Sequence, residues 1–114
     1  MDDAFQSWLE QAVSQPGILA GVVRVNAQTV LVKSRQPEYP EAKIKELIRG
    51  LAESVQALQQ NRIATGYLRW NFENALVHCA TGSNETLALL LTGKEMTDSA
   101  TVGRLMLEFL QIAS

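Results

Sequence analysis

The 114-residue chain contains only one cysteine and one histidine, so it is poor in the residues that disulfides and soft metal sites require. A single cysteine excludes an intramolecular disulfide and is typical of a reducing compartment. One histidine and one cysteine supply at most two ligands of the kind that zinc prefers, whereas a zinc site takes three or four protein ligands. We therefore expect no disulfide, no metal site and no cofactor.

Positive charge and long apolar runs are also scarce. Ten Lys and Arg residues stand against twelve Asp and Glu, and the basic ones are scattered from Arg24 to Arg104 without forming the stripe usual in nucleic-acid-binding domains. No run approaches the roughly 18 apolar residues that a membrane helix needs. The acidic start, MDDAFQSWLEQAV, lacks the basic first segment and apolar core of a signal peptide. The sequence predicts a cytoplasmic protein with no nucleic-acid partner and no membrane insertion.

Three segments show the periodicity of amphipathic helices, in which apolar residues recur three and four positions apart. The first spans residues 3–14 and the last spans residues 96–113. The strongest pattern runs through residues 40–60, where Pro40 and Glu41 suit a first helical turn. In chain order, the predicted buried stripes are Phe5, Trp8, Leu9, Ala12 and Val13, then Ile44, Leu47, Ile48, Leu51, Val55 and Leu58, then Val102, Leu105, Met106 and Phe109.

Five segments show strand patterns. ILAGVVRV (18–25) and TLALLLTG (86–93) are almost wholly apolar, so both of their faces should be covered and they should lie centrally in the sheet. TVLVKSR (29–35) alternates apolar and basic residues, which is typical of an edge strand. ATGYLRWNF (64–72) also alternates, and ALVHCAT (75–81) follows it.

The resulting order, α-β-β-α-β-β-β-α, predicts an α+β fold. Short turns, one of them at 73–74, join the strands into a hairpin and a three-strand meander, so the sheet should be antiparallel. Because its central strands are apolar on both faces, helices should cover both sides of one five-stranded sheet. The last helix has its candidate cap at 97–99. The length suits a single domain, residues 1–114.

The adjacent pair His78 and Cys79 raises the question of a catalytic nucleophile and its base. Neighbouring residues of a strand point to opposite faces of the sheet, so the two side chains should diverge. A nucleophile and its base need about 2.6–3.2 Å between reacting atoms, which this arrangement forbids. We expect Cys79 to be a buried apolar residue and His78 to be a structural histidine, and we expect a protein that is not an enzyme.

The element order, with PGILAGVVRV at 16–25 and a long helix before the meander, resembles the roadblock family. That family includes dynein-associated light chains, scaffold subunits for Ras-like GTPases and bacterial GTPase-activating partners of gliding-motility GTPases. The resemblance spans nearly the whole chain. Its most specific element is the segment 16–25, which looks like the family's apolar first strand with an inner glycine, Gly21. The family often carries an Asp-Gly-type turn after this strand, where the present chain reads NAQT (26–29).

The resemblance implies the sheet order 2-1-5-4-3, with the long helix alone on one face and the N- and C-terminal helices on the other. It also implies a homodimer in which the strands at 64–72 pair edge to edge and the helices at 40–60 pack together. Family members use this dimer as a platform for a small Ras-like GTPase, and some accelerate GTP hydrolysis without supplying a catalytic residue.

Two groups of residues are candidates for the dimer and partner interface. Tyr67, Arg69 and Trp70 lie on the predicted strand at 64–72 and are residue types enriched at interface centres. The alternative for Trp70 is an ordinary core position. The second group lies on the wet side of the long helix, where the alternative is a merely solvated surface: Lys45, Arg49, Glu53 and Gln56.

Two functional classes stay open. The first is a non-enzymatic interaction module of the kind the resemblance implies. The second is a PAS-like or profilin-like domain that senses a small ligand in a pocket between sheet and helices. A pocket needs a few convergent polar groups, and the two apolar strands at 18–25 and 86–93 offer mainly aliphatic surface, which favours helix packing.

Overall fold

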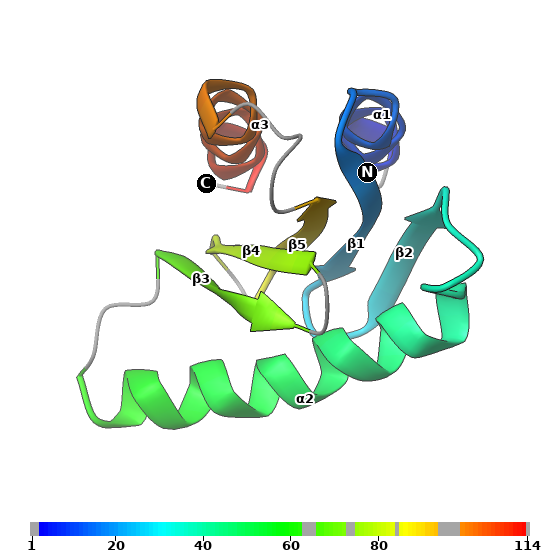
Figure 1. Cartoon of the computed structure of the whole chain (residues 1–114). Coiled ribbons are helices and arrows are strands. Elements are labelled where there is room, and N and C mark those ends of the chain that lie inside the picture. Colours follow the sequence, from blue (N-terminus) through cyan, green and yellow to red (C-terminus); the bar gives the residue numbers. More distant parts are fainter. Residues whose placement is uncertain (1–2, 63–65, 73–74, 84, 94–98, 114) are drawn as a thin grey trace.

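The computed structural model describes residues 3–62, 66–72, 75–83, 85–93 and 99–113, which form three helices and five strands. The strands make one antiparallel sheet in the order β2-β1-β5-β4-β3. Helix α2 covers one face of the sheet, and α1 and α3 lie side by side over the other (Figure 1). The elements are α1 (Asp3–Val13), β1 (Ile18–Val25), β2 (Thr29–Ser34), α2 (Glu41–Gln60), β3 (Tyr67–Phe72), β4 (Ala75–Thr81), β5 (Leu87–Gly93) and α3 (Ser99–Ile112).

The predicted α+β class, element order and sheet order are confirmed, and most element boundaries agree within one residue. Strand β3 begins at Tyr67, three residues later than the alternation predicts. Residues 64–65, the predicted turn at 73–74 and the first two candidate cap positions, 97–98, lie outside the described residues.

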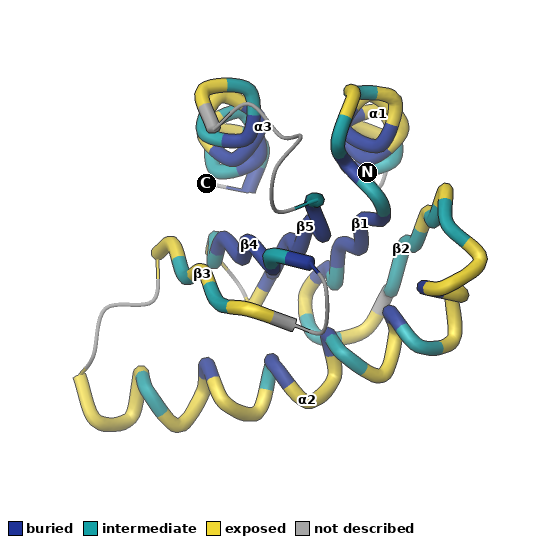
Figure 2. Tube along the Cα trace, in the orientation of Figure 1, coloured by how far each residue is buried: buried dark blue, intermediate teal, exposed yellow. Residues whose placement is uncertain are grey.

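The sheet separates two apolar layers. One layer joins α1 and α3 to the sheet through residues such as Leu9, Leu90 and Phe109, and the other joins α2 to the sheet through residues such as Ile48 and Leu89. Figure 2 shows buried residues running along β1, β4 and β5, and along the side of α2 that faces them. Because β1 and β5 are flanked by strands on both edges, the prediction that these two apolar strands lie centrally is confirmed.

Helix α3 is tied to α1 by polar and aromatic contacts. The indole Nε1 of Trp8 donates a hydrogen bond of 2.8 Å to the carbonyl oxygen of Leu105. The ring of Phe109 lies 5.3 Å from that of Trp8 and 5.9 Å from that of Phe5, centroid to centroid, in the tilted geometry that aromatic pairs prefer. These contacts fix the two helices next to each other on one face.

Gly21 is a glycine because α1 packs directly onto the backbone of β1. A Cβ at this position would lie 2.8 Å from Cδ1 of Leu9, 3.0 Å from Cδ2 of Leu90 and 3.3 Å from Cγ1 of Val13. Those separations are shorter than ordinary contacts between carbon atoms. The inner glycine noted in the sequence therefore allows the close approach of α1 to the sheet.

The two edges of the sheet differ in their covering. On β2, Val30, Leu31 and Val32 are partly buried and Lys33 is exposed, as predicted for an edge strand. On the opposite edge, β3 pairs with β4 alone among the described strands. The predicted alternation of β3 holds for its described side chains, because Leu68 and Trp70 pack under α2 whereas Tyr67, Arg69 and Asn71 are exposed.

Candidate interaction surfaces

The side chains of His78 and Cys79 point to opposite faces of the sheet, as predicted. Nδ1 of His78 lies 2.7 Å from the hydroxyl oxygen of Tyr67, and its Nε2 lies 3.1 Å from Oγ1 of Thr92. Cys79 is fully buried in the layer beneath α2. His78 is therefore a hydrogen-bonded structural histidine, and the two residues do not form a nucleophile and base pair.

The protonation equilibria of both residues favour the neutral form. Burial lowers the pKa of His78, and the nearby guanidinium of Arg69 lowers it further. Burial raises the pKa of the Cys79 thiol to about 12. Because the thiolate is the reactive form of cysteine, a thiol with this pKa is inert at neutral pH.

A groove runs between α2 and the edge strand β3, and we call it the α2–β3 groove. Its volume is about 490 Å³. Leu68 and Trp70 form its β3 wall and are only partly buried, so each contacts the core with one side and borders the groove with the other. The groove is lined by Glu46, Leu47, Gly50, Leu51, Ser54 and Leu58 from α2 and by Leu68, Arg69 and Trp70 from β3.

The α2 side of this groove has a leucine at each end and two small residues between them. Leu47, Gly50, Ser54 and Leu58 follow one another three or four positions apart, so they lie along one flank of the helix. A Cβ built at Gly50 meets no heavy atom within 4 Å. The flank is therefore open, and its small central side chains leave a depression between the two leucines.

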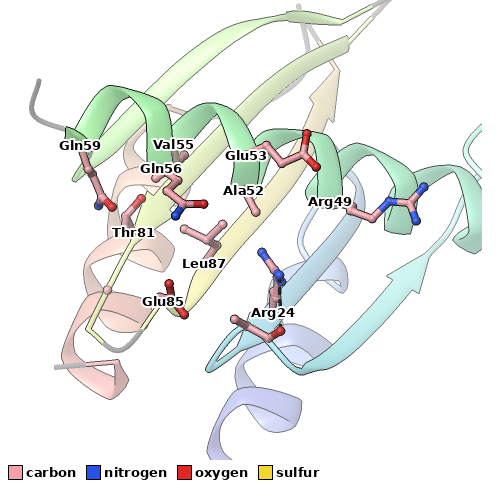
Figure 3. A pocket seen from close by; sticks show the side chains of 12 residues that line it. Arg24, Arg49, Ala52, Glu53, Val55, Gln56, Gln59, Thr81, Glu85 and Leu87 are labelled. Atoms are coloured by element: carbon pink, nitrogen blue, oxygen red, sulfur yellow. Dashed lines mark hydrogen bonds between the residues drawn. The ribbon is translucent and has the colours of Figure 1, made fainter. Parts of the chain in front are cut away.

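A second, smaller cavity lies on the other flank of α2, and we call it the polar pocket (Figure 3). Its volume is about 190 Å³. In Figure 3, Arg24, Leu87 and Glu85 lie on the strand side of the pocket and Gln56 and Gln59 extend toward them from α2. The full lining is Arg24, Ala27, Arg49, Ala52, Glu53, Val55, Gln56, Gln59, Thr81, Gly82, Glu85 and Leu87.

Several solved structures share this architecture at low sequence identity. A Roadblock/LC7 domain from Streptomyces avermitilis matches with a TM-score of 0.64 and 16% identity, over 94% of this chain and 92% of that one. The gliding protein MglB from Thermus thermophilus matches with a TM-score of 0.70 and 18% identity, over 97% and 89%. MglB from Myxococcus xanthus matches with a TM-score of 0.71 and 4% identity, over 96% and 87%.

The chain has the roadblock fold. No sequence model of a protein family matches the chain, and no curated protein sequence does. The shared property is thus a roadblock arrangement of helices and strands, built from a sequence that differs at more than four of every five positions from these three structures.

On this roadblock scaffold, the candidate interface residues fall into separate places. Trp70 faces the α2–β3 groove. Arg69 borders the groove at the strand edge but alternates with Trp70, so it shares the opposite face of the sheet with Tyr67, whose ring contacts His78. The helix residues lie on the other flank of α2. Of these, Arg49, Glu53 and Gln56 line the polar pocket, and Lys45 lies one turn before Arg49 and is exposed.

Two features of these surfaces were not predicted from the sequence. The first is the groove flank of α2, whose signal was the spacing of Gly50 and Ser54 between Leu47 and Leu58. The second is Arg24, the charged residue in the otherwise apolar β1, whose position within the strand ILAGVVRV was the signal.

The described residues offer neither a metal centre nor a membrane span. Within those ranges, no three His, Cys, Asp or Glu side chains come together as metal ligands. None of the helices in the same part of the chain is long and apolar enough to cross a bilayer.

Proposed function

We propose that this protein is a non-enzymatic module that forms a homodimer through the α2–β3 groove and presents a platform to a small Ras-like GTPase. The observation that carries the proposal is the apolar groove beside the sheet edge β3 in a roadblock fold. The exposed apolar side chains of the groove are unfavourable in water, and a second copy of the chain could cover them.

Two physical arguments support a protein partner at the groove. An apolar hollow lined by Leu47, Leu58 and Trp70 gains free energy when a partner removes it from water. The backbone donors and acceptors on the outer side of β3 can pair with an antiparallel strand, which removes the aggregation hazard of an open edge. A partner that offers a strand and a helix can pair with the open edge of β3 and cover the apolar groove at the same time.

A second copy of the chain offers such a strand and helix in the required arrangement. Under two-fold symmetry, the same patch meets itself, so β3 would pair with β3 and α2 would lie against α2. The small residues Gly50 and Ser54 at the centre of the flank allow two helices to approach closely, with Leu47 and Leu58 packing on either side.

The homodimer is tested by filling the centre of the flank. Gly50→Leu places a branched side chain where the monomer has open space, so the monomer should keep its fold while the close helix approach is blocked. Gly103→Leu on α3 is the matched control, because a Cβ there also meets no heavy atom within 4 Å. We expect light scattering to give a dimer for wild type and Gly103→Leu and a monomer for Gly50→Leu. A dimeric Gly50→Leu would refute this interface.

The GTPase would bind the side of α2 that the dimer leaves open. This side bears Lys45, Arg49, Glu53 and Gln56, and its mixed charge suits a polar partner surface.

Isothermal titration with a Ras-like GTPase of the same organism, loaded with GDP or with a non-hydrolysable GTP analogue, tests the binding. We expect Arg49→Glu to weaken binding by at least about tenfold and Arg104→Glu, an exposed arginine on α3, to leave it unchanged. Equal binding of both variants would exclude this side of α2.

The non-enzymatic role is supported by the state of the two candidate chemical groups. Both ring nitrogens of His78 are within hydrogen-bond distance of Tyr67 and Thr92, and the thiol of Cys79 lies buried on the other face. The packing of Leu89 and Leu91 beneath α2 is aliphatic and fully buried, which argues against the PAS-like or profilin-like arrangement with a ligand between sheet and helix. We place the module in the cytoplasm, where the single free cysteine stays reduced.

A further inference from the structure

Arg24 is an unusual residue for its place in the fold. It lies on the face of β1 that α2 covers, two residues after the fully buried Val22. Its side chain is half-buried, and its hydrogen bond among the described residues is a long one, 3.4 Å from Nη2 to the carbonyl oxygen of Ala27. A guanidinium carries five N–H donors. Most donors of Arg24 therefore have no protein acceptor in the described part of the chain.

A partly buried arginine with free donors favours a carboxylate. Withdrawing the charge from water costs free energy unless an acceptor replaces the water, and the planar guanidinium binds a carboxylate through two parallel hydrogen bonds. Glu53 and Glu85 line the same pocket, yet neither forms an ion pair with Arg24 among the described residues. Within the described ranges, no carboxylate supplies the counter-charge.

The rest of the lining favours a positive group in the same ligand. Glu85 makes no hydrogen bond or ion pair among the described residues and lies beside the strand floor in Figure 3, while the amide of Gln56 points toward that floor. The two arginines of the lining, Arg24 and Arg49, balance its two carboxylates, so the pocket has no net positive charge to favour a multiply charged anion such as phosphate. A ligand with one carboxylate and one ammonium matches both Arg24 and Glu85.

The size and the walls of the pocket further restrict the class of ligand that it can bind. A volume of about 190 Å³ is below the roughly 300–1,000 Å³ of sites for drug-sized ligands, so the pocket suits a small molecule. Ala52, Val55 and Leu87 give it an aliphatic wall. The pocket also lies on the flank of α2 opposite the α2–β3 groove, so dimerisation there would leave it open.

We propose that the polar pocket binds a small zwitterion with an aliphatic side chain, of the class of L-valine, with its carboxylate on Arg24 and its ammonium on Glu85. This inference does not depend on the proposed dimer or GTPase. Binding of a small zwitterion to α2 would place a metabolite next to Arg49 and Glu53, on the same side of the helix as the proposed partner surface.

The test compares L-valine with two analogues that each lack one charge. Isobutylamine lacks the carboxylate, and isovalerate lacks the ammonium. Titrations followed by amide NMR spectra should show saturable binding of L-valine in the low millimolar range, with shifts grouped at the lining residues. Both analogues should bind at least about tenfold more weakly, a difference of about 1.4 kcal/mol.

Variants assign each charge to its residue. Arg24→Gln and Arg24→Lys should each weaken L-valine binding by about tenfold or more, because the first lacks the charge and the second lacks the two-pronged donor geometry. Glu85→Gln should bind L-valine and isovalerate equally. Arg104→Gln on α3 is the control and should bind as wild type does. No saturable response to L-valine, or wild-type affinity in Arg24→Gln, would overturn the proposal whatever the oligomeric state.

Discussion

The hydroxyl oxygen of Tyr67 lies 2.7 Å from Nδ1 of His78, and this contact closes a chain of side chains across three strands, from β3 through β4 to Thr92 on β5. His78 is 5% exposed, and its register partner on β3 is Arg69. The imidazole is thus held between two hydroxyl groups and opposite a permanent positive charge. This environment favours the neutral ring.

The stability of the fold should therefore fall in mild acid. Burial and Arg69 lower the pKa of His78 below its ordinary value of 6.5, so the unfolded chain binds this proton more readily than the folded chain. The contribution of the neutral ring is present above about pH 6.5 and is lost as the pH falls from there toward the lowered folded pKa. Urea unfolding between pH 7.5 and 5 measures it, taken as the difference between wild type and His78→Gln. A difference that stays constant across this range would contradict the assignment.

The first hairpin should gain stability from a glycine. Asn26 and Ala27 both have positive φ, 54° and 63°, and the amide of Gln28 donates to the carbonyl oxygen of Val25 over 3.0 Å. Asparagine tolerates this conformation, but alanine is strained there by its Cβ. Ala27→Gly should therefore raise the free energy of unfolding by about 0.5–1 kcal/mol, and Gln28→Gly, one residue later and without positive φ, should lower it by a similar amount. Equal shifts of the two urea midpoints in the same direction would rule out this reading of the turn.

A methyl group at Gly21 should destabilise the fold. Its substitution by alanine pushes the new Cβ against Leu9, Leu90 and Val13, and overpacking of this kind costs about 1–3 kcal/mol. Gly103→Ala is the matched control, because its Cβ would lie in open space on α3 and alanine favours a helix. We expect the melting temperature to fall for Gly21→Ala and to rise or stay constant for Gly103→Ala. An unchanged melting temperature for Gly21→Ala would mean that α1 does not press on β1 as described.

Much of the fold could be predicted because its elements carry strong local patterns. The period of Ile44, Ile48, Leu51 and Val55 marks the buried side of α2, and strand alternation alone separates His78 from Cys79. The order of the strands in the sheet was harder to predict. Short turns predict which strands are hairpin neighbours, but the pairing of β1 with β5 depends on long-range packing, and it was expected from the family resemblance.

The division of the surfaces could not be predicted from the same patterns. Helical periodicity shows that Gly50 and Arg49 lie on different sides of α2, but which side faces β3 depends on the direction in which the helix crosses the sheet. The contact of Tyr67 with His78 depends on the register between two strands. How many donors of Arg24 lack an acceptor among the described residues depends on how far α2 covers the end of β1. Each is a property of packing between elements distant in the sequence.

Sedimentation equilibrium of the wild type and of Arg69→Glu, at several concentrations and at two ionic strengths, tests the proposed homodimer most directly. Arg69 lies on the outward face of β3, so the fold should survive, and two-fold symmetry would bring the two introduced carboxylates close together, where like charges destabilise a strand pair. The account predicts a wild-type mass of twice 12.6 kDa and an Arg69→Glu dimer that is weaker at low salt and partly restored at high salt. A wild type that keeps a mass of 12.6 kDa into the high micromolar range would contradict it.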